Sequence, residues 1–189
     1  MPDLWNRTLQ TRAPGDKKGG GVAWNFSAHP APDAVVVSLG GNDFNHQGGH
    51  VPSNTSFDQH YEHFIGRIFG AFDHDHAEHA SSGGSSAAAG GTHVVALCGM
   101  GDPEEAKTDP DNNRCRPCPH VEAAVAAFAV ANPTLKQRLH YIFVPCDGSV
   151  VTGDGDIGCN GHKNRAGQLE VARFVAPKLG EILGWNSDV

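Results

Sequence analysis

The sequence lacks any run approaching the ~18 apolar residues that a membrane-spanning helix needs. Its first residues, MPDLWNRTLQTR, have neither the basic segment nor the apolar segment of a secretory signal peptide. Basic residues are also scarce: 14 Lys and Arg stand against 21 Asp and Glu, which gives a formal net charge of −7. We therefore expect no membrane partner, and no nucleic-acid partner, because phosphates require a basic face.

The chain also lacks internal repeats and any break in composition that would mark a second domain. A length of 189 residues fits one domain, and 24 Gly and 12 Pro indicate long loops. The most biased segment, residues 73–92, is rich in His, Ser, Gly and Ala and is typical of a surface loop. We expect a single domain over residues 1–189 with a low-complexity loop at 73–92.

Apolar runs and helical periodicities alternate along the chain. The expected elements are a strand at 34–39, a helix at 57–72, a strand at 93–97, a helix at 120–131, a strand at 139–144 and a final helix after residue 164. The runs are almost continuously apolar, as in strands buried on both faces of a parallel sheet. This alternation predicts an α/β domain with a mainly parallel sheet.

The final helix is expected to bury one apolar stripe and to be kinked or split at Pro177, because proline removes a backbone hydrogen bond. The residues of that stripe are Leu169, Ala172, Ala176, Leu179 and Leu183.

Two loops follow strands at the edge where open parallel sheets place their chemistry. The first is Gly40-Gly41-Asn42-Asp43, whose glycines permit a sharp turn and whose Asn amide can donate a hydrogen bond. The second runs from Asp156 to Asn164 and contains His162, whose imidazole suits a general base. Alone, such a turn commonly just ends a strand, and a loop histidine is commonly a surface residue. Together they predict a site in which Gly40, Gly41 and Asp43 bind substrate.

In this order, the two motifs resemble the SGNH (GDSL-type) hydrolases, most closely the acetyl-esterases of carbohydrate esterase family two. Residues 40–43 match the family's Gly-x-Asn-Asp block, and residues 158–185 match its block of a histidine followed by a helix. The upstream segments MPDLWNRTL and WNFSAHPAPDAVV extend the resemblance over almost the whole chain. The resemblance implies a three-layer, flavodoxin-like fold.

The resemblance also implies a serine esterase that uses no cofactor, is secreted and acts on acetylated carbohydrate or another small ester. His162 maps to the general base and Asn42 to an oxyanion donor. The acid that orients the histidine in this family normally lies two or three residues before it, where this chain has Asn160 and Cys159. Asn160, through its carbonyl oxygen, or Asp156 is expected to replace it.

The family's nucleophile block, Gly-Asp-Ser, is absent from this sequence. The nearest substitute, Ser149 in Asp147-Gly148-Ser149, follows the wrong strand for the family fold and is not favoured. We expect that Met1 is an internal methionine of a longer esterase or the start of a truncated relative, and that the strand bearing the serine is missing. Such a chain is expected to be poorly soluble or a molten globule, and inactive on acetyl esters. The alternative is a non-catalytic glycan-binding relative.

Five cysteines leave at least one thiol unpaired within the chain. Cys115 and Cys118, followed by His120, have the composition of a zinc site, and a zinc-stabilised interaction module is a third alternative. Because no second ligand pair has zinc-ribbon spacing, a disulfide or two free thiols is the favoured interpretation there. Cys146 and Cys159 bracket the loop before His162, which suggests a bridge between them.

Overall fold

The computed structural model describes residues 25–44, 51–72, 91–99, 115–153, 155–159 and 162–185. Strands and helices alternate along these residues as the sequence predicts. The elements are η1 (Phe26–Ala28), β1 (Ala34–Val37), α1 (Asn54–Phe72), β2 (His93–Gly99), α4 (Cys118–Ala131), η4 (Lys136–Arg138), β3 (Leu139–Val144) and α5 (Arg165–Leu183). The low-complexity loop lies outside the described residues over 73–90.

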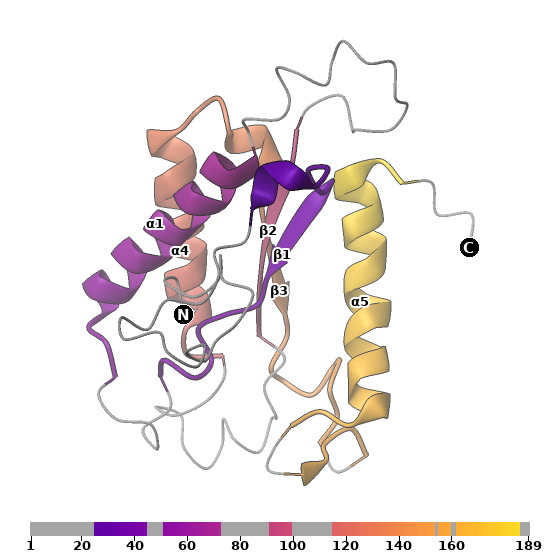
Figure 1. Cartoon of the computed structure of the whole chain (residues 1–189). Coiled ribbons are helices and arrows are strands. Elements are labelled where there is room, and N and C mark those ends of the chain that lie inside the picture. The colour runs from indigo at the N-terminus through magenta and orange to yellow at the C-terminus, as the bar shows by residue number, and fades with distance from the viewer. Residues whose placement is uncertain are drawn as a thin grey trace, which may run out of the picture.

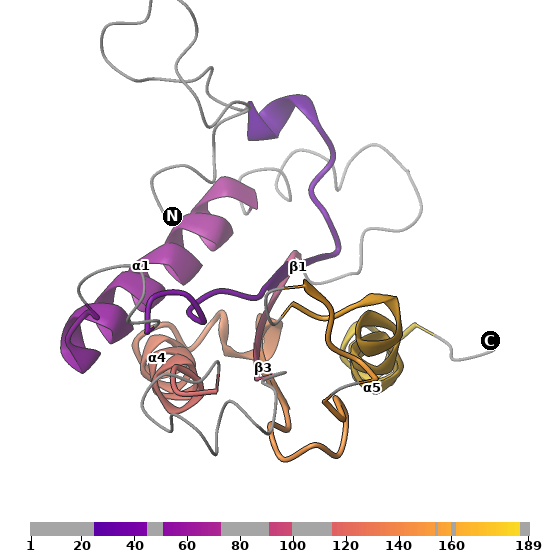
Figure 2. The same ribbon diagram turned by 90° about the horizontal axis from the view of Figure 1, so that it is seen from below.

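The three strands form one parallel sheet in the order β1-β2-β3. Helices α1 and α4 lie on one face of this sheet and α5 lies on the other, so the fold has three layers (Figures 1 and 2). The α/β, three-layer fold that the sequence predicts is confirmed. All three strands run the same way, so the loops that follow them gather at one edge, at the bottom of Figure 1.

The larger core lies between the sheet and helices α1 and α4. Strand β2 is central, and it is buried along six of its seven residues. Helix α1 turns an aromatic and aliphatic stripe toward β2 because these side chains recur at helical spacing. Its buried residues are Phe57, Tyr61, Phe64, Ile65, Ile68 and Phe69.

The second core, under α5, is smaller, and the stripe expected for this helix is wrong in its first part, whereas Leu179 does pack against this core. Leu169 is 49% exposed, whereas Gly167, Val171 and Val175 are buried. Gly167 decides which face turns inward, because its position touches the backbone of Asp156 and leaves no room for a side chain. Packing at the start of the helix therefore sets its rotation.

Helix α5 runs unbroken from Arg165 to Leu183, so the expectation that Pro177 splits it is wrong. Pro177 is on an exposed position of the helix, where water can bond the Arg173 carbonyl that proline leaves without an amide partner. None of the helices in the described ranges is long and apolar enough to cross a bilayer.

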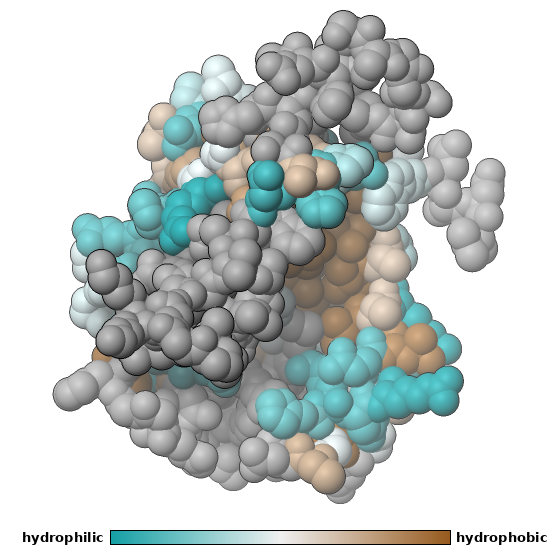
Figure 3. All heavy atoms as spheres, in the orientation of Figure 1, coloured by the Kyte–Doolittle hydropathy of each residue, from teal (hydrophilic) through white to brown (hydrophobic). Residues whose placement is uncertain are grey.

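Apolar side chains also remain on the surface on the α5 side of the molecule. Val36 on β1 is 45% exposed, and Leu169 on α5 is 49% exposed. Figure 3 shows apolar atoms gathered between the sheet and α5. Within the described residues, β1 pairs only with β2, so its other edge is open.

A histidine pair joins the amino ends of β2 and β3. His93 Nδ1 lies 3.0 Å from His140 Nε2, with the ring planes 12° apart and the centroids 5.2 Å apart. Nitrogens so close at that centroid separation face each other edge to edge, so one ring donates and the other accepts. Burial lowers the pKa of both histidines, and Arg138 lowers that of His93 further.

Candidate active site

The turn after β1 is tight and requires its first glycine. Gly40 has φ +113°, and a Cβ there would lie 3.1 Å from the Phe57 ring and 3.2 Å from Pro117 Cβ. The Asp43 amide donates to the Gly40 carbonyl over 3.0 Å and closes the turn. Asn42 and Asp43 are exposed at its tip.

Phe44 anchors this turn in the protein interior. Its ring is 1% exposed and packs at 5.0 Å from the Phe57 ring, 5.7 Å from the His120 ring and 5.5 Å from the Arg116 guanidinium carbon. We call Phe57, Arg116 and His120 the Phe44 cradle. Phe57 comes from the start of α1, His120 from the start of α4 and Arg116 from the turn directly before α4, so the N-terminal ends of two helices hold the turn.

Two disulfides tie the start of α4 to the sheet. Cys98, near the end of β2, pairs with Cys118, and Cys115 pairs with Cys146, which follows β3. The expected Cys146–Cys159 bridge is therefore wrong, and Cys159 is a free, exposed thiol. The α4 N-terminus packs beside the end of β3, and sequence proximity alone does not show this.

The same disulfides overturn the zinc interpretation. Cys115 and Cys118 bond to different sulfurs, so neither is available as a thiolate ligand. Across the part of the chain that the structure describes, no cluster of three His, Cys, Asp or Glu side chains could hold a metal ion.

His162 lies on a short hairpin before α5. Ile157 and Lys163 form an antiparallel bridge, the Gly158 amide donates to the His162 carbonyl over 2.7 Å, and the His162 amide donates to the Cys159 carbonyl over 3.1 Å. The hairpin exposes the imidazole to solvent. His162 is thus held through its backbone.

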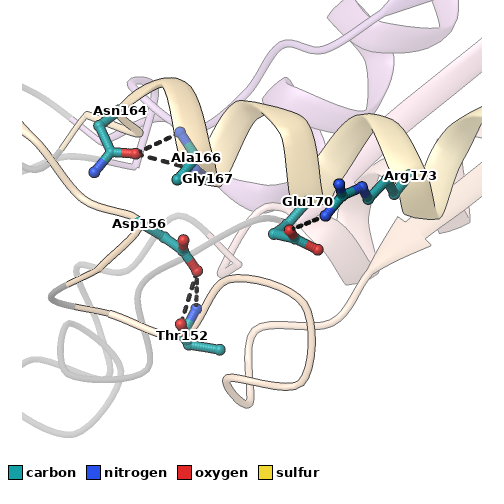
Figure 4. A network of polar contacts seen from close by, with 7 residues as sticks. All are labelled: Thr152, Asp156, Asn164, Ala166, Gly167, Glu170 and Arg173. Atoms are coloured by element: carbon teal, nitrogen blue, oxygen red, sulfur yellow. Dashed lines mark hydrogen bonds and ion pairs between the residues drawn. The ribbon is translucent and has the colours of Figure 1, made fainter.

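Asp156 and Asn164 hold the base of this hairpin (Figure 4). One carboxylate oxygen of Asp156 accepts from the Thr152 amide over 2.8 Å and from the Thr152 hydroxyl over 2.7 Å, which lowers the pKa of Asp156. Asn164 Oδ1 caps α5 by accepting from the amides of Ala166 and Gly167. The backbone amide of Asn164 also donates to the backbone carbonyl of Asp156 over 2.9 Å, so the helix cap and the carboxylate belong to one network.

The structure shows no bond from Asp156, one of the two expected orienting residues, to the imidazole. Among the described residues, no hydrogen bond joins Asp156 to His162, and the Asp156 carboxylate is occupied by Thr152. Asn160 lies outside those residues. Asn42 and His162 share the carboxyl edge of the sheet, but within the ranges described no hydrogen bond joins their loops.

Ser149 lies on the same edge but is paired with an acid rather than a base. Its amide donates to Asp147 Oδ1 over 2.9 Å, and hydrogen bonds from Ser149 lower the pKa of that carboxyl. This arrangement stabilises a turn and does not activate the hydroxyl as a nucleophile.

Sequence reasoning missed the contact of His120 with Asp58, which is described below. It considered His120 only as a zinc ligand, and nothing in the local spacing links residue 120 to residue 58. The second turn of α1 offered one signal, since Asp58 is an acidic residue directly after the buried Phe57.

No protein-family model matches the sequence, and no curated protein matches it. Two solved structures do. One is a carbohydrate esterase family 2 enzyme with a carbohydrate-binding domain from Corynascus thermopiles (Myceliophthora fergusii), with TM-score 0.64 and 22% identity over 98% of this chain. The other is an acetyl xylan esterase (Est2A) from the rumen bacterium Butyrivibrio proteoclasticus, with TM-score 0.64 and 12% identity over 98% of this chain.

The chain spans less than half of either protein, namely 45% of the first and 46% of the second. At these identities the likeness is one of fold. The chain therefore has an esterase-like α/β fold, as the resemblance to the SGNH hydrolases and carbohydrate esterase family two implies.

Proposed function

We propose that this chain is the part of a carbohydrate ester hydrolase that supplies the general base, His162, and one oxyanion donor, Asn42. The observation that carries the proposal is the placement of these two loops at the carboxyl edge of a parallel sheet with this fold. In such sheets ligands bind at that edge.

The proposed reaction needs only protein groups. His162 accepts the proton of a serine hydroxyl as its oxygen attacks the ester carbonyl, and Asn42 donates a hydrogen bond to the oxyanion that forms. The imidazolium then protonates the leaving sugar oxygen, and water hydrolyses the acyl-serine by the same route. The proposed reaction requires a serine that this sequence does not supply in a Gly-Asp-Ser motif.

Acetylated carbohydrate is the proposed substrate class because the two matched structures are a carbohydrate esterase family 2 enzyme and an acetyl xylan esterase. Asp156 is assigned an indirect part, since it stabilises the hairpin that carries His162. The two disulfides support folding in an oxidising compartment, in agreement with the secretion that the resemblance implies.

The test compares the 189-residue chain with the same chain extended by the residues encoded immediately upstream. Acetate release from acetylated xylan and turnover of 4-nitrophenyl acetate are measured for both. We expect turnover only in the extended protein, with kcat reduced about 10²–10⁴-fold by His162→Ala and about 10²–10³-fold by Asn42→Ala. His63→Ala, an exposed change on α1, is the control. An extended protein without turnover, or with full activity after His162→Ala, contradicts the proposal.

A non-catalytic glycan-binding protein is the second candidate, favoured by the absence of Gly-Asp-Ser and by the pairing of Ser149 with Asp147. It predicts that the chain binds acetylated xylo-oligosaccharides in calorimetry, that Asn42→Ala weakens this binding, and that no upstream residues confer turnover. A stop codon in frame directly before Met1 favours it.

A further inference from the structure

We propose that His120, held by Asp58, is a positioning residue for the Asn42 turn. Its role in catalysis rests on the proposed function, whereas its role in ordering the turn does not. Asn42 is exposed, and among the described residues its side chain makes no hydrogen bond, so only its backbone can fix where its amide points. That backbone is closed on one side by Gly40 and anchored on the other by Phe44.

The His120 ring lies flat against Phe44. The ring planes are 8° apart with centroids 5.7 Å apart, whereas the Phe57 ring meets Phe44 edge-on at 65°. The two rings stay parallel only while the imidazole keeps one χ2 angle, which is its rotation about the Cβ–Cγ bond. His120 therefore needs a partner that fixes this rotation.

Asp58 is that partner. His120 Nδ1 lies 3.2 Å from Asp58 Oδ1, and both side chains are mostly buried, with exposures of 23% and 29%. Asp58 Oδ1 itself is inaccessible and makes no hydrogen bond within the described residues. A carboxylate oxygen withdrawn from water is costly without a cationic or donor neighbour, so the imidazole and the carboxylate hold each other in place.

The pair also fixes α1 and α4 relative to each other, because Asp58 belongs to the first and His120 to the second. The start of α4 is itself tied to the sheet through Cys118. A line of contacts thus runs from the sheet through α4 and His120 to Phe44, two residues from Asn42.

Hydrogen exchange of the Asp43 amide is the direct test, because this amide closes the turn and its exchange does not depend on catalysis. We expect His120→Ala to accelerate it about two- to tenfold, the range that loss of one aromatic contact gives. His120→Phe, which keeps a flat ring, restores most of the protection, and His120→Asn does not. The amide of the buried Val95 reports global unfolding, and His63→Ala is the matched control.

Asp58→Ala distinguishes positioning from general stabilisation. It is expected to accelerate Asp43 exchange in the wild-type background but to have little effect in the His120→Phe background, because Asp58 then has no imidazole to hold. Equal acceleration in both backgrounds, or acceleration at Asp43 no larger than at Val95, overturns the proposal.

In the extended, active protein, His120→Ala is expected to lower kcat with KM little changed, and His120→Phe to recover kcat. If Asp43 exchange responds as expected while kcat does not, His120 positions the turn and the oxyanion role of Asn42 is overturned. If neither responds, the positioning role itself is overturned.

Discussion

The two loops of the candidate site are held in different ways. The Asn42 turn is fixed to the main core by the buried Phe44 and by the disulfide-tied start of α4. The His162 hairpin is fixed by hydrogen bonds that the Asp156 and Asn164 side chains accept, beside the smaller core of α5. Asn42, the proposed oxyanion donor, thus depends on packing and cross-links, and His162, the proposed general base, depends on polar contacts.

The largest difference in response between the two loops is expected when the Cys98–Cys118 disulfide is removed by replacing both residues with Ser. Loss of the bridge, which links residues 20 apart, should lower the free energy of unfolding by about 2–4 kcal/mol. Thermal unfolding measures this cost. Exchange of the Asp43 amide should accelerate more than that of the Asn164 amide, which reports the hairpin. Equal acceleration would show that the bridge stabilises both loops alike.

Cys159→Ser is the matched control, since this thiol is free and exposed. It should change stability by less than about 0.5 kcal/mol.

Removal of the α5 cap is expected to affect the His162 hairpin and not the Asn42 turn. Asn164→Ala should cost about 1 kcal/mol in urea unfolding, because the amides of Ala166 and Gly167 lose their acceptor. The nuclear magnetic resonance signals of His162 should shift, and Asp43 exchange should stay unchanged. Asn164→Asp retains an acceptor and should recover most of the stability. A comparable change at Asp43 would contradict the independence of the two loops.

A smaller effect is expected on acidification of Asp156. Its folded pKa is lowered below the ordinary 3.8 by the bonds from Thr152, so its contribution is complete above that pH and is lost as the pH falls through the folded value. The difference in stability between wild type and Asp156→Asn should therefore be constant above about pH 5 and shrink below about pH 4. Unfolding midpoints from pH 6 to pH 2 measure it. A difference that persists unchanged at pH 2 would show that ionisation is irrelevant.

The smallest effect is expected at the opposite edge of the sheet, in the His93–His140 pair. A lowered histidine pKa means that the unfolded chain binds protons more readily, so stability should be unaffected above the ordinary value of 6.5 and fall below it. His93→Gln should flatten the pH dependence of the unfolding midpoint between pH 7 and pH 5. Hydrogen exchange of the Asp43 and Asn164 amides should change only by as much as the free energy of global unfolding changes.

Local patterns predicted the fold well because they are set by neighbouring residues. The strand predicted at 139–144 is β3 itself, and the helix predicted at 120–131 begins only two residues earlier, at Cys118. The turn at Gly40 also follows from its own residues.

The predictions that were wrong concern features that depend on contacts between residues far apart in the sequence. Spacing along the chain gave no reason to pair Cys146 with Cys115 rather than Cys159. Helical periodicity predicted an apolar stripe for α5 that includes the exposed Leu169, whereas the close approach of Gly167 to Asp156, which periodicity does not show, turns Val171 and Val175 inward. The Phe44 cradle combines residues from two segments, the start of α1 and the start of α4, that are about 60 residues apart in the sequence, so no local pattern predicts it.

The two disulfides interleave along the chain, since Cys115 lies inside the loop closed by Cys98 and Cys118. Exchanging the partners of Cys115 and Cys118, three residues apart, produces an isomer with the same number of bonds. A chain that oxidises before α4 is formed is free to close that isomer, and the thiolate of Cys159 can attack such a bridge and reopen it. Oxidative refolding should therefore pass through isomers that separate by chromatography, and the yield of the native one should depend on a thiol–disulfide buffer.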